Sequence, residues 1–261
     1  MYFKLLWSEF AALPEVEAIA LGGSRAGGDY DEKSDYDLYI YCTSIPYESL
    51  RKCILEKYCQ YMEIGNSFWE LEDDCTMKDG TDIDILYRNI EDFSQTIRSV
   101  VEEHAAYNGY TTCMWHNLLH SQILYDKNGK LESLQKKYQI PYPDKLRDNI
   151  IRKNLRLLTG NLPSYDVQIK KAAARKDIVS VNHRTAAFLE SYFDIIFALN
   201  KLTHPGEKRM VQYAKEQAEI LPAAFEENLD KLFQNLFVDL EKAVQTLEEM
   251  IAELEKIFYT Y

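Results

Sequence analysis

Apolar residues form short runs, or alternate with polar residues, at three places in the first half of the chain: Val16–Gly22, Asp35–Cys42 and Thr81–Arg88. Patterns of this length and period predict β-strands. Apolar residues at helical spacing predict helices over residues 3–12, 47–62 and 89–105. The first half is therefore predicted to combine a sheet with helices.

From about Pro143 onward the strand patterns stop, and long helical patterns replace them. That proline and Pro141 mark the change, so we expect two domains, over residues 1–140 and 141–261. Residues 178–200 are apolar on several sides, which is typical of the central helix of a bundle. The expected fold class is α+β, with an N-terminal domain built on a mixed β-sheet with flanking helices and a C-terminal α-helical bundle.

The last stretch of the chain carries two columns of apolar residues at seven-residue spacing. One column is Phe233, Leu240, Leu247 and Leu254, and the other is Phe237, Val244, Ile251 and Phe258. A helix with such a seam needs another helix to cover it. Packing inside its own bundle is the favoured interpretation, and a homodimer formed through this C-terminal helix is the alternative.

The charge balance limits the classes of partner. The 261 residues include 42 acidic and 30 basic side chains, a net charge of −12, so no basic surface is expected for nucleic-acid phosphates. A small or cationic substrate is favoured instead. The five cysteines form no CxxC pair, the first residues lack the apolar run of a secretory signal, and no stretch approaches the roughly 18 apolar residues of a membrane span. We therefore expect a cytoplasmic protein with free thiols and with neither a nucleic-acid nor a membrane partner.

Acidic residues alternate with apolar ones in two of the predicted strands. Since successive strand residues point to opposite faces, Asp35 and Asp37 share one face, and Asp82 and Asp84 share a face of the third strand. Two unit charges about 4 Å apart repel by roughly 4 kcal/mol at an effective dielectric constant near 20, so such a pair needs a cation or a shared proton. If these strands pair, their carboxylates converge as in a two-metal site for phosphoryl transfer. Mg²⁺ is the expected cation, because it prefers carboxylate oxygens.

A Gly-Gly-Ser turn precedes these acids. Gly22 and Gly23 follow a predicted strand and lack a Cβ atom, so their backbone N–H groups can approach a phosphate closely. The Ser24 hydroxyl can add a hydrogen bond. We expect this turn to hold a triphosphate, and Arg25 either neutralises phosphate charge or pairs with a nearby acid.

Together these residues resemble the nucleotidyltransferases of the DNA polymerase β superfamily. The signature positions of that family are occupied by Gly23, Ser24, Asp35 and Asp37. Asp84 resembles the third acid of the family, with Asp82 as the alternative, and the resemblance covers about residues 18–90. It is strongest to small bacterial members with a helical carboxyl-terminal domain, a group that includes antibiotic nucleotidyltransferases.

The resemblance implies an enzyme that uses a nucleoside triphosphate, expected to be ATP, and two Mg²⁺ ions. AMP would pass to a hydroxyl group of a small acceptor, such as an aminoglycoside-like or lincosamide-like antibiotic, with release of pyrophosphate. Asp35, Asp37 and Asp84 would be the catalytic residues and metal ligands, and Asp84 would also be the general base. The expected nucleotide-binding residues are Gly23, Ser24, Arg25, Arg88 and Lys208.

Two other classes of protein fit part of the sequence. The run Gly22–Ala26 nearly matches the nucleophile elbow of serine hydrolases, but the glycines from Gly27 onward would break the helix that must follow the serine. A catalytically inactive nucleotidyltransferase-like interaction module, such as a toxin-neutralising partner, is the second alternative. The intact acids argue against it, since a binding module has no need of a repulsive carboxylate cluster.

Overall fold

The chain folds into two compact units in the computed structural model, which describes residues 2–27, 34–68, 70–160 and 163–260. One unit comprises Met1–Arg98 and Met114–Ile140, and the other comprises Ser99–Cys113 and Pro141–Tyr261. Among the described residues, all strands belong to the first unit, and the regular structure of the second is helical. The predicted α+β class is therefore confirmed.

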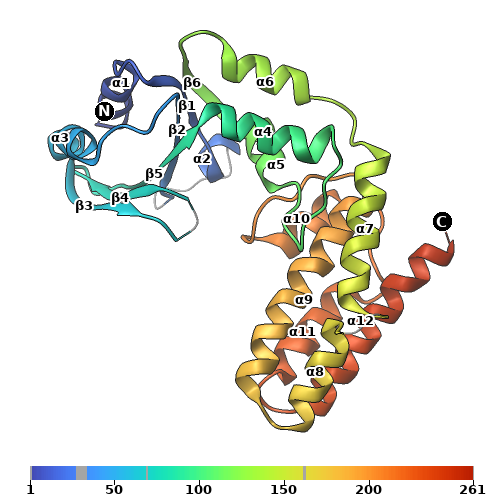
Figure 1. Ribbon diagram of the computed structural model, residues 1–261. Helices are drawn as coiled ribbons and strands as arrows, with labels where there is room; N and C mark the ends of the chain where they lie inside the picture. Colours follow the sequence, from blue (N-terminus) through green and yellow to red (C-terminus); the bar gives the residue numbers. More distant parts are fainter. Residues whose placement is uncertain (1, 28–33, 69, 161–162, 261) are drawn as a thin grey trace. The chain divides into compact units, whose positions relative to one another are not determined.

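The first unit is built on a six-stranded mixed sheet (Figure 1). Its strands are β1 (Val16–Leu21), β2 (Tyr36–Cys42), β3 (Cys59–Asn66), β4 (Glu72–Met77), β5 (Asp82–Asn89) and β6 (Gln122–Asp126). They lie in the order β3-β4-β5-β2-β1-β6. β2 and β5 run parallel, whereas the other neighbouring pairs are antiparallel. The three strands predicted from the sequence are β1, β2 and β5, which are neighbours in the middle of the sheet.

Helices pack on both faces of this sheet. In chain order they are α1 (Tyr2–Ala11), α2 (Gly23–Gly27), α3 (Glu48–Tyr58), α4 (Ile90–Val101), α5 (Cys113–His120) and α6 (Lys130–Tyr138). On one face, Leu6 of α1 and Leu55 of α3 join Ile40 of β2 in a buried core. On the other face, Phe93 of α4 packs on Tyr41, with ring centroids 5.0 Å apart. Alternate residues of β2 thus serve different faces.

The edge strands β3 and β6, and β4 next to β3, are not among the strands predicted from the sequence. The helix predicted over residues 47–62 ends at Tyr58, and the chain continues as β3. Within β3, Met62 and Ile64 pack against the sheet core while Glu63 is exposed, which is the period of two of a strand. Pairing with β4 along this edge therefore overrides a local pattern that also fits a helix.

An acidic residue on the buried face of β4 interrupts the alternation of polar and apolar residues in its sequence. Cys75 and Met77 point into the sheet core, as alternation requires. Asp73 points the same way and is fully buried, and its carboxylate pairs with Arg51 of α3 at 3.3 Å. It also accepts a hydrogen bond from the Gly65 N–H at 2.9 Å. An acidic residue on the buried face is possible only because these partners compensate its charge.

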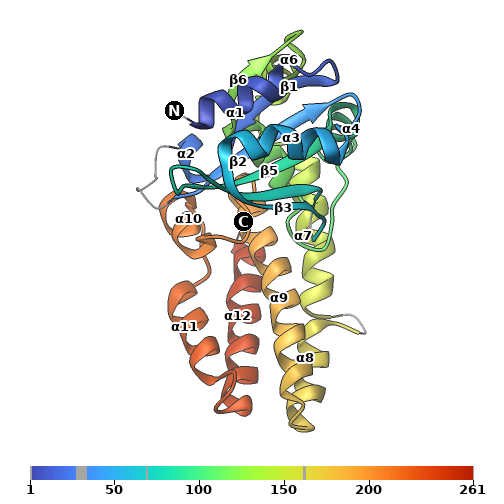
Figure 2. The same ribbon diagram turned by 90° about the vertical axis from the view of Figure 1, so that its left-hand side faces the viewer.

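The second unit is a helical bundle (Figure 2). Its helices are α7 (Asp144–Leu158), α8 (Tyr165–Ala174), α9 (Ile178–Leu199), α10 (Met210–Gln217), α11 (Phe225–Asn235) and α12 (Leu240–Thr260). α9 contributes the largest share of the buried residues, including the whole of residues 191–198. The prediction of a central buried helix over residues 178–200 is therefore confirmed.

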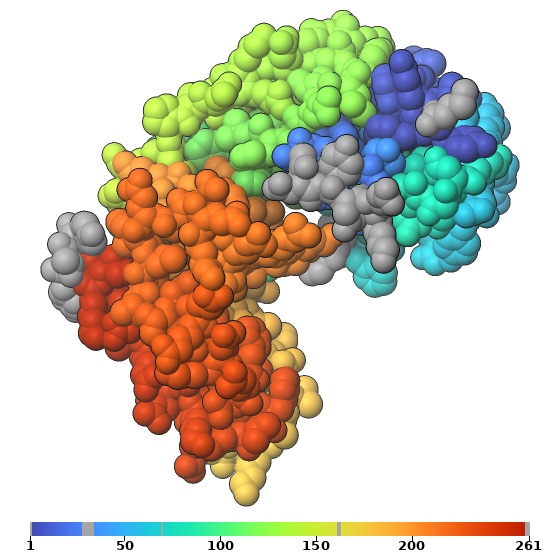
Figure 3. Space-filling view, turned by 180° about the vertical axis from the view of Figure 1, so that it is seen from behind, coloured from blue at the N-terminus to red at the C-terminus, as the bar shows by residue number. Residues whose placement is uncertain are grey.

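The apolar seam of α12 is covered inside its own unit. Leu247, Ile251 and Leu254 are buried in the same core as α9. Phe233 lies in α11 and Phe237 follows that helix, so neither belongs to α12 as the pattern predicted, and both are exposed. Figure 3 shows the outer surfaces of α11 and α12 in orange and red. The seam residues thus stabilise the fold, as the favoured interpretation requires, and a homodimer stays a prediction.

The prediction of free thiols is met in the structure. All five cysteines are free thiols, and three of them, Cys42, Cys59 and Cys75, are buried in the core of the first unit. In the described ranges of the chain, each helix is too short or too polar to span a bilayer.

A buried carboxyl group connects three segments of the second unit. Asp194 of α9 is 2% exposed and accepts hydrogen bonds from the Thr111 N–H at 3.1 Å, the Thr111 hydroxyl at 2.7 Å and the Asn154 amide at 3.0 Å. The Asn154 amide also donates to the Tyr107 carbonyl at 3.1 Å. Burial raises the pKa of Asp194 to about 6. These bonds fasten the segment Ser99–Cys113 to α7 and α9.

We expect Asp194→Ala to lower the free energy of unfolding by about 3 kcal/mol, because it leaves buried donors of Thr111 and Asn154 without an acceptor. Asp230→Ala, which removes an exposed carboxylate from α11, is the matched control and should change stability by no more than about 0.5 kcal/mol. Urea unfolding followed by circular dichroism measures both. Equal effects of the two substitutions would contradict the role assigned to Asp194.

Candidate active site

The turn after β1 lies against the start of β2. Because the two strands are antiparallel neighbours, with Leu21 paired with Leu38, the end of β1 meets the beginning of β2. The Gly22 N–H donates a hydrogen bond to the Asp37 carbonyl at 2.8 Å. Gly23 has a φ of +60°, and a Cβ atom there would lie 1.7 Å from Asp37 Oδ2. The backbone conformation therefore favours glycine, and a larger residue would have to displace the Asp37 carboxylate.

The parallel pairing of β2 with β5 places two of the predicted acids side by side. Asp37 is the register partner of Asp84. Their neighbours Leu38 and Ile85 are fully buried in the sheet core, so Asp37 and Asp84 point to the opposite face, as the alternation predicted. Asp35 directly precedes β2, and its charge acts on Asp84 as well. The fold thus brings the three acids into one region of the sheet.

Burial and repulsion act together on Asp84. Its carboxyl group is half-buried, and desolvation, followed by the negative charges of Asp35 and Asp37, raises its pKa to about 6. Asp74 and Glu72 add smaller contributions of the same sign. The negative charges of the site therefore repel one another, and a bound cation would reduce this repulsion.

Sequence reasoning missed the acids of β4. Asp74 is the register partner of Asp84 on one side and of Glu63 on the other, so a row of carboxylates runs from Asp37 across four adjacent strands. The Asn66 amide donates to Asp74 at 2.9 Å. The alternation of Glu72, Asp74 and Thr76 with buried residues was the available signal, and the buried Asp73 obscured it.

The chemistry of these side chains suits Mg²⁺, because carboxylate oxygens are its preferred protein ligands. The raised pKa of Asp84 independently marks a cluster short of positive charge. Over the part of the chain that the structure describes, however, no three His, Cys, Asp or Glu side chains are gathered closely enough to hold a metal ion. The residue types of the site therefore fit Mg²⁺, whereas the described side chains are not close enough together to coordinate an ion.

Arg25 holds the backbone that leads into β2. Its guanidinium donates to the Ser34 carbonyl at 2.9 Å and to the Asp35 carbonyl at 3.0 Å. The same group lies over the Tyr36 ring, 4.0 Å from its centroid. Arg25 therefore positions Asp35 through its backbone. Ser24 precedes it in α2 and is partly exposed.

Arg88 is buried and connects elements of the first unit. Its guanidinium binds both carboxylate oxygens of Glu70, at 2.6 and 2.8 Å, and donates to Asn117 Oδ1 of α5 at 2.7 Å. It also lies over the Tyr39 ring, 4.2 Å from the centroid. These contacts, between residues far apart in the sequence, give Arg88 a structural role next to β2.

The remaining predicted residues lie as follows. Lys208 is exposed in the turn before α10 and belongs to the second unit. The nucleotide contacts predicted for Arg25, Arg88 and Lys208 stay predictions, since the described contacts of the two arginines are with the protein itself. Asp82, the alternative third acid, is exposed at the start of β5, where it accepts a hydrogen bond from the Thr76 hydroxyl at 2.7 Å. Its register partner is Thr76, whereas that of Asp84 is Asp37 on β2.

Two protein families match separate parts of the chain. Residues 4–108 match the family described as nucleotidyltransferase domain. Residues 111–210 match a family described as a domain of unknown function, DUF4037. No curated protein matches the chain. The first matched segment contains the turn and every acid of the candidate site.

Three solved structures are similar to this chain, each at 12% sequence identity. A nucleotidyltransferase-like protein from Exiguobacterium sibiricum 255-15 has a TM-score of 0.46, with 99% of this chain and 74% of that one covered. An aminoglycoside 6-adenyltransferase from Bacillus subtilis has a TM-score of 0.29, with 97% and 89% covered. The CCA-adding enzyme of Thermotoga maritima, complexed with tRNA, has a TM-score of 0.25, with 98% and 79% covered.

Gly23→Ala is expected to lower the free energy of unfolding by about 1–2 kcal/mol, since alanine is strained at positive φ and its methyl group would collide with the Asp37 carboxylate. Gly27→Ala is the matched control in the same short helix, because a Cβ atom there meets no described atom within 4 Å. Thermal unfolding compares the two variants with the parental chain. A Gly23→Ala variant as stable as the Gly27→Ala variant would show that the turn does not pack against Asp37.

Asp84→Asn is expected to stabilise the metal-free protein at pH 8 by about 1 kcal/mol, after allowance for solvent screening. Folding raises the pKa of this carboxyl from its ordinary value of 3.8 to about 6. Between these two pH values the folded state therefore binds more protons than the unfolded state. The free energy of unfolding therefore falls as the pH rises through this range, and the whole loss is present above about pH 6. The amide removes this cost, so its advantage should vanish near pH 4.

Urea unfolding in the presence of EDTA, at pH 8 and at pH 4, measures this difference for each variant against the parental chain. Asp82→Asn, two residues along the same strand and exposed, should leave stability close to the parental value at both pH values. A pH-independent effect of Asp84→Asn would refute the repulsion among these acids.

Proposed function

Because residues 4–108 match the nucleotidyltransferase domain family, we propose that this chain transfers a nucleoside monophosphate, AMP from ATP, to a hydroxyl group of a small acceptor and releases pyrophosphate. The observation that carries the proposal is the register of β2 and β5, which sets Asp37 beside Asp84 with Gly23 packed against the Asp37 carboxylate. Metal-dependent phosphoryl transfer requires neighbouring carboxylates to hold the metal and, beside them, a turn that can bind phosphate.

In this proposal Asp35, Asp37 and Asp84 hold Mg²⁺. When bound, the ions neutralise phosphate charge and lower the pKa of the attacking hydroxyl. Asp84, on the strand next to Asp37, accepts the proton of that hydroxyl as general base. Asp84 is preferred to Asp82 because Asp84 is the register partner of Asp37, whereas Asp82 lies opposite Thr76 and accepts its hydrogen bond.

The turn supplies the phosphate contacts. Gly23 has no side chain between its backbone and the Asp37 carboxylate, so a triphosphate bound by the turn would lie next to the acids that hold the metal. The Ser24 hydroxyl is partly exposed beside it and donates a hydrogen bond to a phosphate oxygen. Arg25 supports this arrangement by fixing the Asp35 backbone.

The acceptor is proposed to be cationic, of the aminoglycoside or lincosamide kind. Negative charge continues beyond the three proposed metal ligands, because Asp74 and Glu72 of β4 also act on Asp84. Carboxylates that are not needed for the metal would favour an ammonium-bearing substrate over a neutral one.

The direct test incubates the full chain with labelled ATP, Mg²⁺ and a panel of aminoglycosides, lincosamides and uncharged hydroxyl compounds. Pyrophosphate release together with a new adenylylated product is the expected result. Asp37→Asn should lower the rate at least about a hundredfold, since it removes a metal-holding oxygen at the reacting phosphate. Asp82→Asn should stay within a few-fold of the parental rate.

Equal rates for the Asp37→Asn and parental chains would overturn the assignment of the site. A complementary calorimetric titration with ATP and Mg²⁺ tests the alternative of an inactive module. If the parental chain binds neither of them, the domain is an interaction module and not an enzyme.

A further inference from the structure

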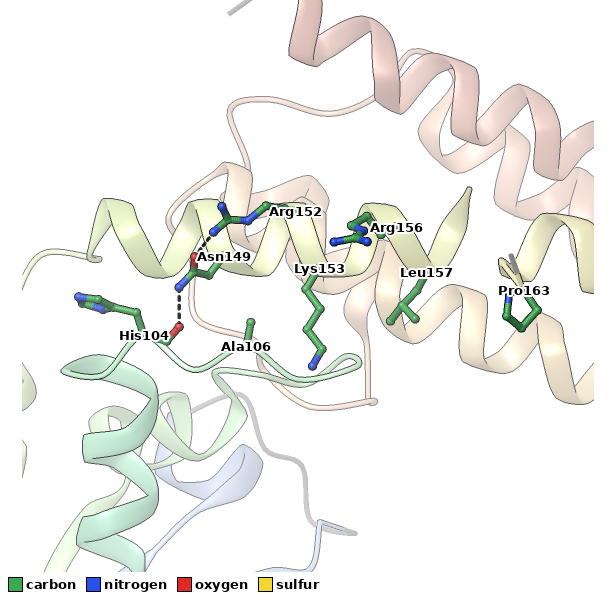
Figure 4. Close-up of a pocket in the computed structure, with 8 residues that line it drawn as sticks. All are labelled: His104, Ala106, Asn149, Arg152, Lys153, Arg156, Leu157 and Pro163. Carbon is green, nitrogen blue, oxygen red and sulfur yellow. Dashed lines mark hydrogen bonds between the residues drawn. The ribbon is translucent and has the colours of Figure 1, made fainter. Parts of the chain in front are cut away.

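The second unit contains a pocket that the proposed catalytic site does not use. It has a volume of about 630 Å³ and lies between α7 and the segment around His104 and Ala106 (Figure 4). Arg152, Lys153 and Arg156 of α7 contribute to its lining. Every lining residue belongs to the second unit, whereas the acids described above belong to the first. The pocket therefore shares no lining residue with the proposed catalytic site.

Hydrogen bonds hold the two walls of this pocket together. The Asn149 amide of α7 donates to the His104 carbonyl at 2.8 Å, and the Arg152 guanidinium donates to Asn149 Oδ1 (Figure 4). Farther along α7, the Asn154 amide bonds to the Tyr107 carbonyl at 3.1 Å and to the buried Asp194. These bonds fix the backbone of the two walls relative to each other, which lowers the entropic cost of binding.

The charge of the pocket is opposite to that of the protein. Three cationic side chains and His104 line it, and none of its described lining residues is acidic. Residues 149–158 contain no acidic residue at all, in a chain with a net charge of −12. A concave surface lined by one sign of charge concentrates ligands of the opposite sign.

We propose that this pocket binds a small molecule that carries two or more phosphate groups. Guanidinium groups bind phosphate oxygens through paired N–H donors, and the lysine adds a compact charge. The volume is that of a small-molecule site. Several adjacent cations suit clustered oxyanions better than a single carboxylate. A nucleic-acid strand is disfavoured, since such ligands are held along extended basic grooves with stacking aromatic residues.

The test is a calorimetric titration of the full chain with pyrophosphate in EDTA, without Mg²⁺. We expect saturable binding that weakens at least about tenfold in the double variant Lys153→Gln/Arg156→Gln, since each lost charged hydrogen bond is worth about this factor. Lys145→Gln/Lys171→Gln is the matched control, because it removes two exposed helical lysines outside the pocket. The control should bind pyrophosphate as the parental chain does.

The Lys153→Gln/Arg156→Gln variant also separates this proposal from the proposed function, since it should lose metal-free pyrophosphate affinity and keep the transfer rate of the parental chain. Circular dichroism verifies that each variant is folded. The proposal is overturned if the parental chain does not bind pyrophosphate, or if the pocket variant binds it as tightly as the control. It is also overturned if the pocket variant loses affinity for a short single-stranded RNA but not for pyrophosphate.

Discussion

The candidate active site depends on the parallel, in-register pairing of β2 with β5. This pairing forces Asp37 and Asp84 to be neighbours, although their charges repel each other. The buried residues Leu38 and Ile85 prevent relief of that repulsion, because a one-residue slip would move these apolar side chains out of the core and the acids into it. Hydrophobic burial thus stabilises an arrangement of charges that is unfavourable by itself, and that repulsion is what prepares the site for a cation.

The same constraint determines the residues of the preceding turn. Since β1 is the other neighbour of β2, the chain leaving β1 must pass directly beside Asp37. The carboxylate occupies the space that a Cβ atom of residue 23 would need, so glycine leaves that carboxylate in place even before any phosphate is considered. Because residue 23 has no side chain, the backbone N–H groups of the turn are accessible next to the acids. Phosphate binding uses such accessible N–H groups.

The parts of this site that depend on local residue patterns can be predicted from the sequence, whereas the parts that depend on contacts between distant segments cannot. β1 is a short apolar run, and acidic and apolar residues alternate in β2 and β5, so these strands and the face of their acids were predictable. β4 was not, because Asp73 is buried against Arg51, and a pair formed between distant segments leaves no local pattern. Asp74 was missed with the strand that carries it. The contacts of Arg88 with Glu70 and Asn117 are equally long-range, so no spacing rule indicated its burial.

Net charge illustrates the same limit of sequence reasoning. A total of −12 argues against anionic partners only if the charges are evenly distributed, and folding distributes them unevenly. The sheet collects carboxylates in one row because its register aligns them across neighbouring strands. Helix α7 collects cations because residues three and four positions apart share a helical face, and the hydrogen bonds from Asn149 and Asn154 hold a wall opposite that face. Local electrostatics, which decide what each unit binds, are therefore a product of pairing and packing and not of composition.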